Sequence, residues 1–174
     1  SMALAKAGAE IYHGGLIGND GQAFIDACKE YGVNHEYIRT IDGPTGHTII
    51  QVDKNAQNSI LLFGGANQRF TKEYIDEVIS HIEKGDLLLL QNEINLLPYI
   101  IDTAYEKGMK IVLNPSPFNE KLSACDLNKI GIFLLNEVEG EQLTGSNDPQ
   151  EILSGLKKRF PQAEIVLTLG KDGS

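Results

Sequence analysis

The chain has 174 residues, of which 41% are hydrophobic and 22% charged, and it carries a formal net charge of −9. This length predicts about one domain, and the hydrophobic fraction is sufficient for an ordinary buried core. The negative charge argues against a nucleic-acid partner, because neutralising phosphates requires clustered Lys and Arg side chains. The sequence contains neither an apolar run of about 18 residues nor a signal-peptide pattern, so we expect no membrane span.

The two cysteines, Cys28 and Cys125, share no short spacing, which favours a reducing compartment. Cys28 also lies at helical spacing from Phe24 and Tyr31, so it is predicted to be a core residue rather than a reactive thiol. We therefore expect a globular, cytoplasmic protein.

Short apolar runs alternate along the chain with longer stretches of helical period, which is typical of a parallel sheet with crossover helices. The predicted strands are, in chain order, 10–17, 86–90, 110–113, 130–135 and 164–169. The runs 87–90 and 165–167 are apolar at every position, which predicts strands that are covered by helices on both faces.

Three helices between these strands have recognisable ends. One is predicted to follow Thr71 as its N-cap and to end at Gly85. A second is predicted to open at Asn95 and to end before Gly108, with a proline tolerated in its first turn. The run 148–151 predicts a capping box, in which a side-chain acceptor at position 148 pairs with a glutamate three residues later.

The section 36–63 breaks the alternation, because it holds three β-like runs (37–41, 47–53 and 59–63) and no helical stretch. Residues 54–57 are predicted to form the hairpin turn between the last two runs. A hairpin inserted here does not join the interior of a parallel sheet easily. We expect it to stand off the main body as a flap or to form a subunit contact.

Polar residues follow four of the predicted strands, at the edge where an open parallel sheet binds its ligand. They are Gln91-Asn92-Glu93, Asn114-Pro115-Ser116-Pro117, Asn136-Glu137-Val138-Glu139 and Thr168-Leu169-Gly170-Lys171-Asp172-Gly173. Each run taken alone has a structural explanation, as a helix cap, a strand terminator or a plain turn. Together, at one edge of a sheet, they predict a site for a phosphate or polyol ligand.

The common motifs of other site types are missing from the sequence. It contains no G-x-x-x-x-G-K-[ST] loop and no G-x-G-x-x-G after a strand, and it has no G-x-S-x-G hydrolase elbow. The four histidines show no metal-ligand spacing with one another or with the cysteines. A nucleotide or sugar site of another type remains.

Several motifs, in their order and spacing, resemble those of the ribokinase (PfkB-type) carbohydrate kinase family. They are Ser1, Gly8 and Gly18 as the tail of a first signature, Gly15 to Asp20 before a helix, Thr45-Gly46 and Gly64 to Asn67 around a β-lid, Asn136 to Glu139 as N-x-x-E, and Thr168-Leu169-Gly170 as a nucleotide-side loop. The similarity covers essentially all 174 residues. N-x-x-E alone is a weak signal, whereas the ordered set is specific.

The resemblance implies an α/β fold, a ribokinase-like three-layer sandwich with a mainly parallel sheet flanked by helices and a small β-lid hairpin. It divides the chain into a partial core of residues 1–35 and 64–174 and a lid segment of residues 36–63. It also implies a homodimer formed through the β-lid.

The resemblance further implies an ATP-dependent sugar kinase that uses Mg²⁺, with a monovalent cation such as K⁺ in the full-length parent. Glu93 would bind the sugar hydroxyls, and Thr48 and Leu62 would close over the ring. Asn136 would contact phosphate, and Thr168 and Gly170 would line the nucleotide. Glu139 would hold the Mg²⁺–phosphate network through water.

Two departures from the family accompany this assignment. The sugar-binding loop before Ser1 and the G-A-G-D motif, whose Asp is the catalytic base, are not in the sequence, so we expect the chain to be inactive alone and assign it no catalytic residue. Ribose is the expected sugar, because Gln91-Asn92-Glu93 resembles the ribokinase version of that loop. Fructose, 2-keto-3-deoxygluconate and nucleosides remain alternatives, as does a non-catalytic module that binds a sugar or a nucleotide.

Overall fold

The computed structural model describes residues 1–52, 54 and 58–174, and the chain forms two compact units, Ser1–Thr71 and Lys72–Ser174. The predicted hairpin turn at 54–57 lies, apart from Lys54, outside the described residues. The division into a core of 1–35 and 64–174 and a lid of 36–63 stays a prediction. Among the described residues, no helix combines the length and the apolar composition that crossing a membrane requires.

The first unit is built on two short parallel strands, β1 (Gly15–Ile17) and β2 (Ile38–Thr40), which pair directly. Its helices are α1 (Met2–Lys6), α2 (Gln22–Glu30) and the 3₁₀ turn η1 (Gly65–Gln68). The strand predicted at 10–17 is shorter than expected, because Tyr12 makes only an isolated bridge to Asn34 before β1 begins. On α2, Cys28 is fully buried, which confirms its core position, and burial raises the pKa of its thiol.

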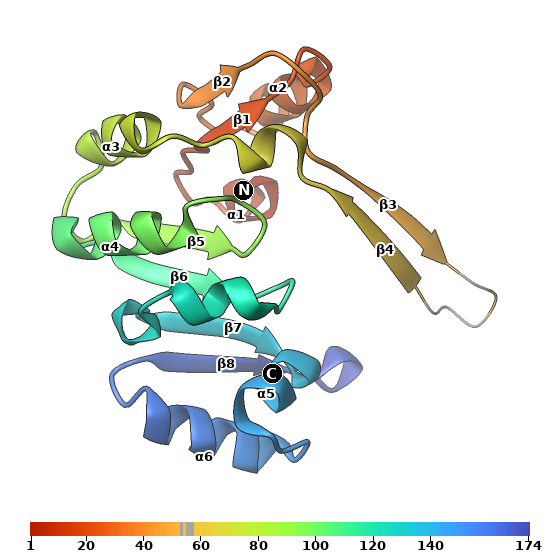
Figure 1. Ribbon diagram of the computed structural model, residues 1–174, viewed down its shortest axis with the longest axis vertical. Coiled ribbons are helices and arrows are strands. Elements are labelled where there is room, and N and C mark those ends of the chain that lie inside the picture. Colours follow the sequence, from red (N-terminus) through yellow and green to blue (C-terminus); the bar gives the residue numbers. More distant parts are fainter. Residues whose placement is uncertain (53, 55–57) are drawn as a thin grey trace. The chain divides into compact units, whose positions relative to one another are not determined.

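A long hairpin also belongs to the first unit. Strands β3 (His47–Val52) and β4 (Asn58–Phe63) pair antiparallel in a continuous register from His47 opposite Phe63 to Val52 opposite Asn58. Figure 1 shows the two strands projecting away from β1, β2 and α2. The first β-like run of the predicted lid segment, 37–41, is not part of this hairpin. It forms β2, which pairs in parallel with β1.

The second unit contains four of the five strands predicted for the parallel sheet. Its strands are β5 (Leu87–Gln91), β6 (Lys110–Asn114), β7 (Ile132–Asn136) and β8 (Glu164–Thr168), which pair in chain order and all in parallel. The helical segments are α3 (Lys72–Ser80), α4 (Leu97–Lys107), η2 (Glu120–Ala124), η3 (Leu127–Lys129), α5 (Glu137–Thr144), α6 (Pro149–Arg159) and η4 (Gly170–Asp172). The four strands were all predicted to within two residues at each end, and the fold is α/β with a parallel sheet flanked by helices.

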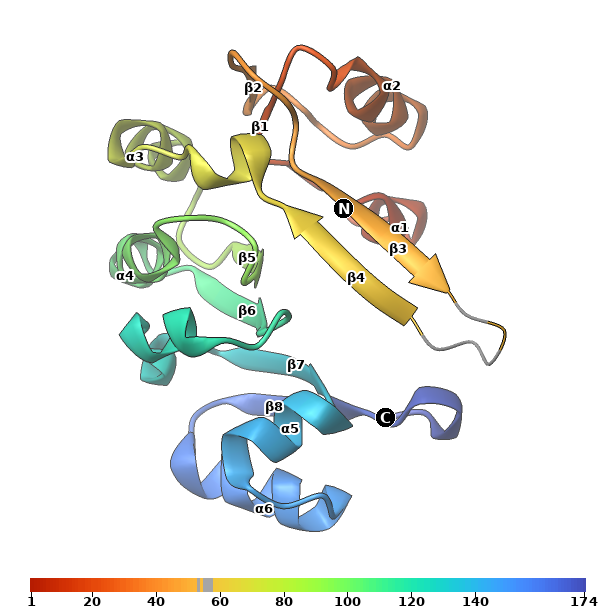
Figure 2. The same ribbon diagram turned by 45° about the vertical axis from the view of Figure 1, so that its right-hand side comes forward.

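Helices cover one face of this sheet more completely than the other. Strands that pair in chain order through right-handed crossovers receive all their connecting helices on the same face. Figure 2 shows α4 beside β5 and β6, and α6 next to the edge strand β8. On β5, Leu90 is buried, whereas Leu87 and Leu89 remain 64% and 46% exposed. The prediction that the run 87–90 is covered on both faces is therefore wrong for this unit.

The start of one helix and the capping box of another also differ from the prediction. Helix α4 begins at Leu97 after Leu96, which has a left-handed backbone (φ 57°), rather than opening at Asn95. Asp148 caps α6 as expected, since its carboxylate accepts from the amides of Gln150 and Glu151, both at 2.9 Å. The return bond of the predicted capping box is missing, because Ser146 intervenes: its hydroxyl donates to the Glu151 carboxylate at 2.6 Å and accepts from the Asp148 amide at 3.2 Å.

Candidate functional site

Two neighbouring strands of the second unit bring four of the predicted residues together. Asn136 ends β7 and Thr168 ends β8, and these two residues are register partners. Helix α5 begins directly after Asn136, and Glu139 lies in its first turn. Gly170 begins η4, two residues after Thr168. We call these four residues the phosphate-side cluster. It lies at the carboxyl edge of the parallel sheet, where such sheets bind ligands.

Asn136 and Glu139 form a complete capping box. The Glu139 amide donates to Asn136 Oδ1 and the Asn136 amide donates to Glu139 Oε2, each at 3.0 Å. Glu139 is only 5% exposed, whereas Asn136 is exposed. The box satisfies orphan amides at the helix start and orients both side chains, so its structural role and a ligand-binding role are compatible.

The β8 side of the cluster is held by one side-chain hydrogen bond and by a turn of the backbone. The Thr168 hydroxyl donates to the Leu135 carbonyl at 3.3 Å, which ties the end of β8 to β7. Gly170 has φ 59°, a left-handed conformation that favours glycine, and the Leu169 amide donates to the Gly173 carbonyl at 2.7 Å. These contacts turn the chain sharply at the sheet edge and leave Thr168 and Gly170 exposed.

Helix α5 packs closely on α6 through a glycine that the sequence analysis missed. A Cβ atom on Gly140 would lie 2.7 Å from Ile152 Cγ2, closer than real side chains approach. Both Gly140 and Ile152 are buried. This contact fixes the position of the helix that carries Glu139, although no local motif in the sequence signals it.

The predicted sugar ligand, Glu93, is exposed in the turn that follows β5. Its neighbour Asn92 is 5% exposed and braces that turn: Asn92 Nδ2 donates to the Pro117 carbonyl at 2.7 Å, and the Asn92 amide donates to the Ser116 carbonyl at 3.1 Å. Asn92 thereby joins the loops after β5 and β6. Asn92 was predicted to lie in the polar rim, but this role could not be predicted, because Pro117 is 25 residues away in the chain.

The other two predicted sugar contacts, Thr48 and Leu62, face each other across the hairpin. They are direct register partners of β3 and β4, and both are exposed, Leu62 by 51%. Because side chains alternate between the faces of a strand, Ile50 and Ile60 share their face, whereas Ile49 and Leu61 lie on the opposite one. Thr48 and Leu62 belong to the first unit, and Glu93 and the phosphate-side cluster to the second.

The described part of the chain offers few side chains that could bind a magnesium ion. No group of three or more His, Cys, Asp or Glu residues suited to a metal occurs among residues 1–52, 54 and 58–174. Glu139 contributes a single buried carboxylate that already accepts one backbone hydrogen bond. This arrangement fits a hydrated Mg²⁺ held mainly by phosphate groups, and it does not fit an all-protein metal cage.

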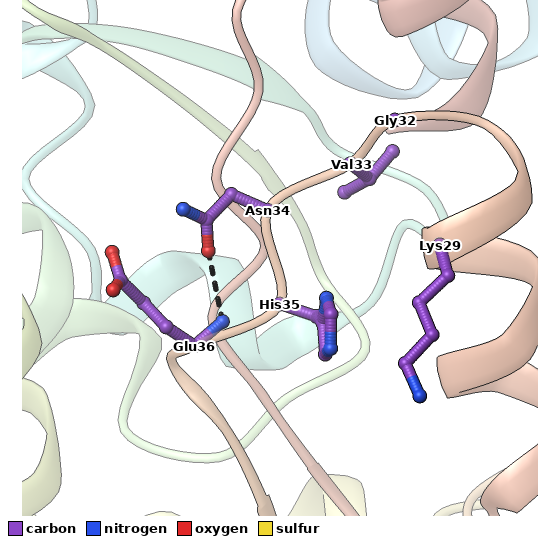
Figure 3. A pocket seen from close by; sticks show the side chains of 6 residues that line it. All are labelled: Lys29, Gly32, Val33, Asn34, His35 and Glu36. Atoms are coloured by element: carbon purple, nitrogen blue, oxygen red, sulfur yellow. Dashed lines mark hydrogen bonds between the residues drawn. The ribbon is translucent and has the colours of Figure 1, made fainter.

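Two open hollows lie away from the predicted residues. One, of about 400 Å³, is in the first unit and is lined by Lys29, Gly32, Val33, Asn34, His35 and Glu36 (Figure 3). In it the Glu36 amide donates to Asn34 Oδ1 at 2.9 Å, a local turn contact. The other, of about 380 Å³, lies in the second unit beside Cys125 and Phe160. Burial raises the pKa of the Cys125 thiol to about 11, so this thiol is protonated at neutral pH.

Comparison with known proteins places the chain among carbohydrate kinases. A family model described as pfkB family carbohydrate kinase matches residues 1–174. The chain is 35% identical to a ribokinase of Haemophilus influenzae, over 99% of this chain and 59% of that protein. It is 31% identical to a deoxyribokinase of Salmonella typhi, over 99% and 56%. Among solved structures, a ribokinase of Cryptococcus neoformans in complex with ADP matches 97% of this chain and 59% of its own, with a TM-score of 0.79 at 25% identity. The chain thus spans a little over half the length of each of these relatives.

Proposed function

Because the chain belongs to the pfkB family of carbohydrate kinases, we propose that it forms part of an ATP-dependent sugar kinase. The proposed reaction converts D-ribose and ATP to D-ribose 5-phosphate and ADP. The observation that carries the proposal is the phosphate-side cluster, in which a family motif caps a helix beside the end of a neighbouring strand. The identity to a ribokinase favours ribose, and the identity to a deoxyribokinase makes deoxyribose the nearest competitor. Fructose, 2-keto-3-deoxygluconate and nucleosides remain alternative substrates within the family, and a non-catalytic binding module is the alternative outside it.

The phosphate-side cluster is proposed to bind the nucleotide. The helix cap uses the side-chain oxygen of Asn136, Oδ1. The side-chain nitrogen, Nδ2, of this exposed residue is proposed to donate to a phosphate oxygen. The exposed turn of Thr168 and Gly170 offers a hydroxyl and a backbone without a side chain against which the nucleotide packs. In line transfer of a phosphoryl group is accelerated mainly by positioning and by neutralisation of charge, which these groups support.

Glu139 is proposed to orient the hydrated Mg²⁺ through water, because its carboxylate is almost fully buried. When bound, Mg²⁺ neutralises phosphate charge. The capping box holds the Glu139 carboxylate in one place, so no reorganisation is needed when the nucleotide arrives. None of the 174 residues is proposed as the base that accepts the hydroxyl proton, and K⁺ is proposed only for the full-length parent.

The sugar is proposed to be held by the Glu93 carboxylate and covered by Thr48 and Leu62 of the lid. Carboxylates accept hydrogen bonds from two sugar hydroxyls at once, and an exposed leucine beside a threonine suits the mixed surface of a sugar ring. Closure of the lid, residues 36–63 with the hairpin as its main part, would exclude water, which competes with the sugar as acceptor.

The hairpin is also proposed to join two copies of the chain. Its face opposite Thr48 and Leu62 carries Ile49, Leu61 and Phe63, which are 54%, 60% and 49% exposed. Contiguous exposed apolar residues on a protruding element are typical of an interaction site. A homodimer formed through the β-lid would cover this face. The cytoplasm stays the predicted location, because both cysteines are free.

Steady-state kinetics of two glutamate variants tests these roles. In the protein that contains this chain, Glu93→Ala should raise the KM for the sugar about tenfold or more and leave the KM for ATP nearly unchanged, since a charged hydrogen-bonding group is lost. Glu139→Gln keeps the acceptor for the Asn136 amide, and it should mainly raise the Mg²⁺ concentration needed for half-maximal rate. Unchanged constants for both variants would contradict the assignment.

A further inference from the structure

The hairpin of the first unit is held at its base by a network of side-chain hydrogen bonds. The residues of this network have no role in the function proposed above. Asp20 Oδ1 accepts two hydrogen bonds from Thr45, from its amide at 2.8 Å and from its hydroxyl at 2.5 Å. The same hydroxyl oxygen accepts from the Gly18 amide at 2.9 Å. The hydroxyl therefore acts as donor and acceptor at once, which allows it one orientation.

Backbone hydrogen bonds also join the segment that follows β1 to the segment that leads into β3. The Ile41 amide donates to the Ile17 carbonyl at 2.8 Å, and the Asn19 amide donates to the Gly43 carbonyl at 3.2 Å. The loop that leads into β3 is thus attached along the segment that follows β1. Thr45 lies two residues before β3 begins, at the last such attachment.

The returning strand is attached at the same place. The Ala66 amide, just beyond β4, donates to the Pro44 carbonyl at 3.1 Å. Glycines permit this close approach: a Cβ on Gly65 would lie 2.7 Å from the Pro44 carbonyl oxygen, and one on Gly18 would lie 2.0 Å from the Gly43 carbonyl oxygen. Both strands of the hairpin therefore leave from one tightly packed crossing.

Beyond this crossing, the hairpin has little other support within its unit. All described side chains of β3 and those of 59–63 in β4 are exposed. An isolated pair of strands is only marginally stable, so the direction of such a hairpin depends on how its base is held. The network at Thr45 lies three residues before Thr48 in the chain.

We propose that Asp20 and Thr45 are positioning residues whose hydrogen bonds set the direction of the hairpin and so present Thr48 and Leu62 to the sugar. This inference rests on the proposed role of the hairpin as a sugar-covering lid. The lowered pKa of Asp20, caused chiefly by the hydrogen bonds from the Thr45 hydroxyl and amide, agrees with a carboxylate that stays ionised in the network.

Matched substitutions at Thr45 separate positioning from mere stability. Thr45→Val removes the hydroxyl at nearly constant volume, whereas Thr45→Ser keeps it and serves as the control. In the protein that contains this chain, Thr45→Val removes the hydrogen bond to Asp20 and the one from the Gly18 amide. It should raise the KM for the sugar about tenfold, because the direction of the hairpin is then less well held, with the KM for ATP unchanged. Thr45→Ser should stay near the wild type. Asp20→Ala should resemble Thr45→Val, and the double variant should be little worse than either single one.

Amide hydrogen exchange reports on the network itself, whether or not the protein is a sugar kinase. In Thr45→Val, but not in Thr45→Ser, the amides of Asn19 and Ala66 should exchange faster, while those of β5–β8 stay unchanged and show that the protein is folded. Unchanged exchange at Asn19 and Ala66 would overturn the proposed network. Faster exchange with an unaltered sugar KM would overturn the positioning role. If the wild type phosphorylates no sugar, the proposed function fails, and exchange alone then decides whether the network holds the hairpin base.

Discussion

At the scale of single residues, the N-x-x-E motif combines a structural role with a proposed functional one. Asn136 and Glu139 cap a helix through two reciprocal hydrogen bonds of 3.0 Å. A capping box of this kind occurs in many proteins without any ligand. What distinguishes this one is the neighbour of Asn136 across the sheet, Thr168, which ends the adjacent strand.

The chain offers a matched test of these two roles, because α5 and α6 both begin with a side-chain cap. Asn136→Ala and Asp148→Ala should each lower the free energy of unfolding by about 1 kcal/mol, the usual cost of losing an N-cap. Only Asn136→Ala should also raise the KM for ATP, by about tenfold, because Asp148 is not in the phosphate-side cluster. Urea unfolding and steady-state kinetics measure the two effects. An equal loss of ATP affinity in both variants would reduce the motif to a stability element.

At the scale of elements, the hairpin stands out because many of its apolar side chains are exposed. Apolar residues occupy both of its faces, and Ile50 and Ile60 on one face are as exposed as Ile49 and Leu61 on the other. An edge or hairpin with so much exposed apolar surface invites pairing with another surface. A sugar on one face and a second copy of the chain on the other would account for both.

Two adjacent leucines of β4 test this division of faces. Leu61 and Leu62 are 60% and 51% exposed and point to opposite sides of the hairpin. If two copies join through this face as proposed, Leu61→Asp should weaken their association about tenfold or more, because it places an unpaired charge in an apolar contact. Leu62→Asp should leave the dimer intact and raise the KM for the sugar. Sedimentation velocity and kinetics follow the two properties, and a dimer that dissociates equally in both variants would refute the assignment of the faces.

The elements also show how far local sequence patterns predict this structure. The four strands of the large sheet were predicted to within two residues at each end, because each is a short apolar run between polar or glycine-containing segments. The pairing of 38–40 with β1 was not predicted, since it depends on contacts between distant segments rather than on the composition of either. The start of α4 was misplaced because Leu96 adopts a left-handed backbone that leucine rarely uses.

The candidate site divides in the same way. The sequence predicted that the runs containing Asn136, Glu139, Thr168 and Gly170 share one edge, because they lie at the carboxyl ends of predicted parallel strands. The resemblance to a kinase family, and not the strand pattern, singled out these four residues, and their ligand contacts stay a prediction. Asn92 and Asp20 owe their roles to partners 25 residues away in the chain, at Pro117 and Thr45. No local spacing signals such contacts, so only the structure identifies them.

At the scale of the whole molecule, the chain consists of two compact units, for which we propose different roles. The unit Ser1–Thr71 carries the lid and its base, and the unit Lys72–Ser174 carries the phosphate-side cluster and Glu93. Membership of the pfkB family covers both units, since the match runs over residues 1–174. The central claim is therefore that the two units serve one reaction, the transfer of a phosphoryl group from ATP to a sugar hydroxyl.

The most direct test of that claim is ADP release by the protein that contains these 174 residues, assayed with ATP, Mg²⁺ and K⁺. D-ribose, deoxyribose, fructose, 2-keto-3-deoxygluconate and nucleosides are supplied in turn, and the sugar-free rate is the control. The account predicts ADP release that depends on sugar, with the highest kcat/KM for D-ribose and phosphate recovered on its 5-hydroxyl. ADP release that no sugar in this panel accelerates would contradict it.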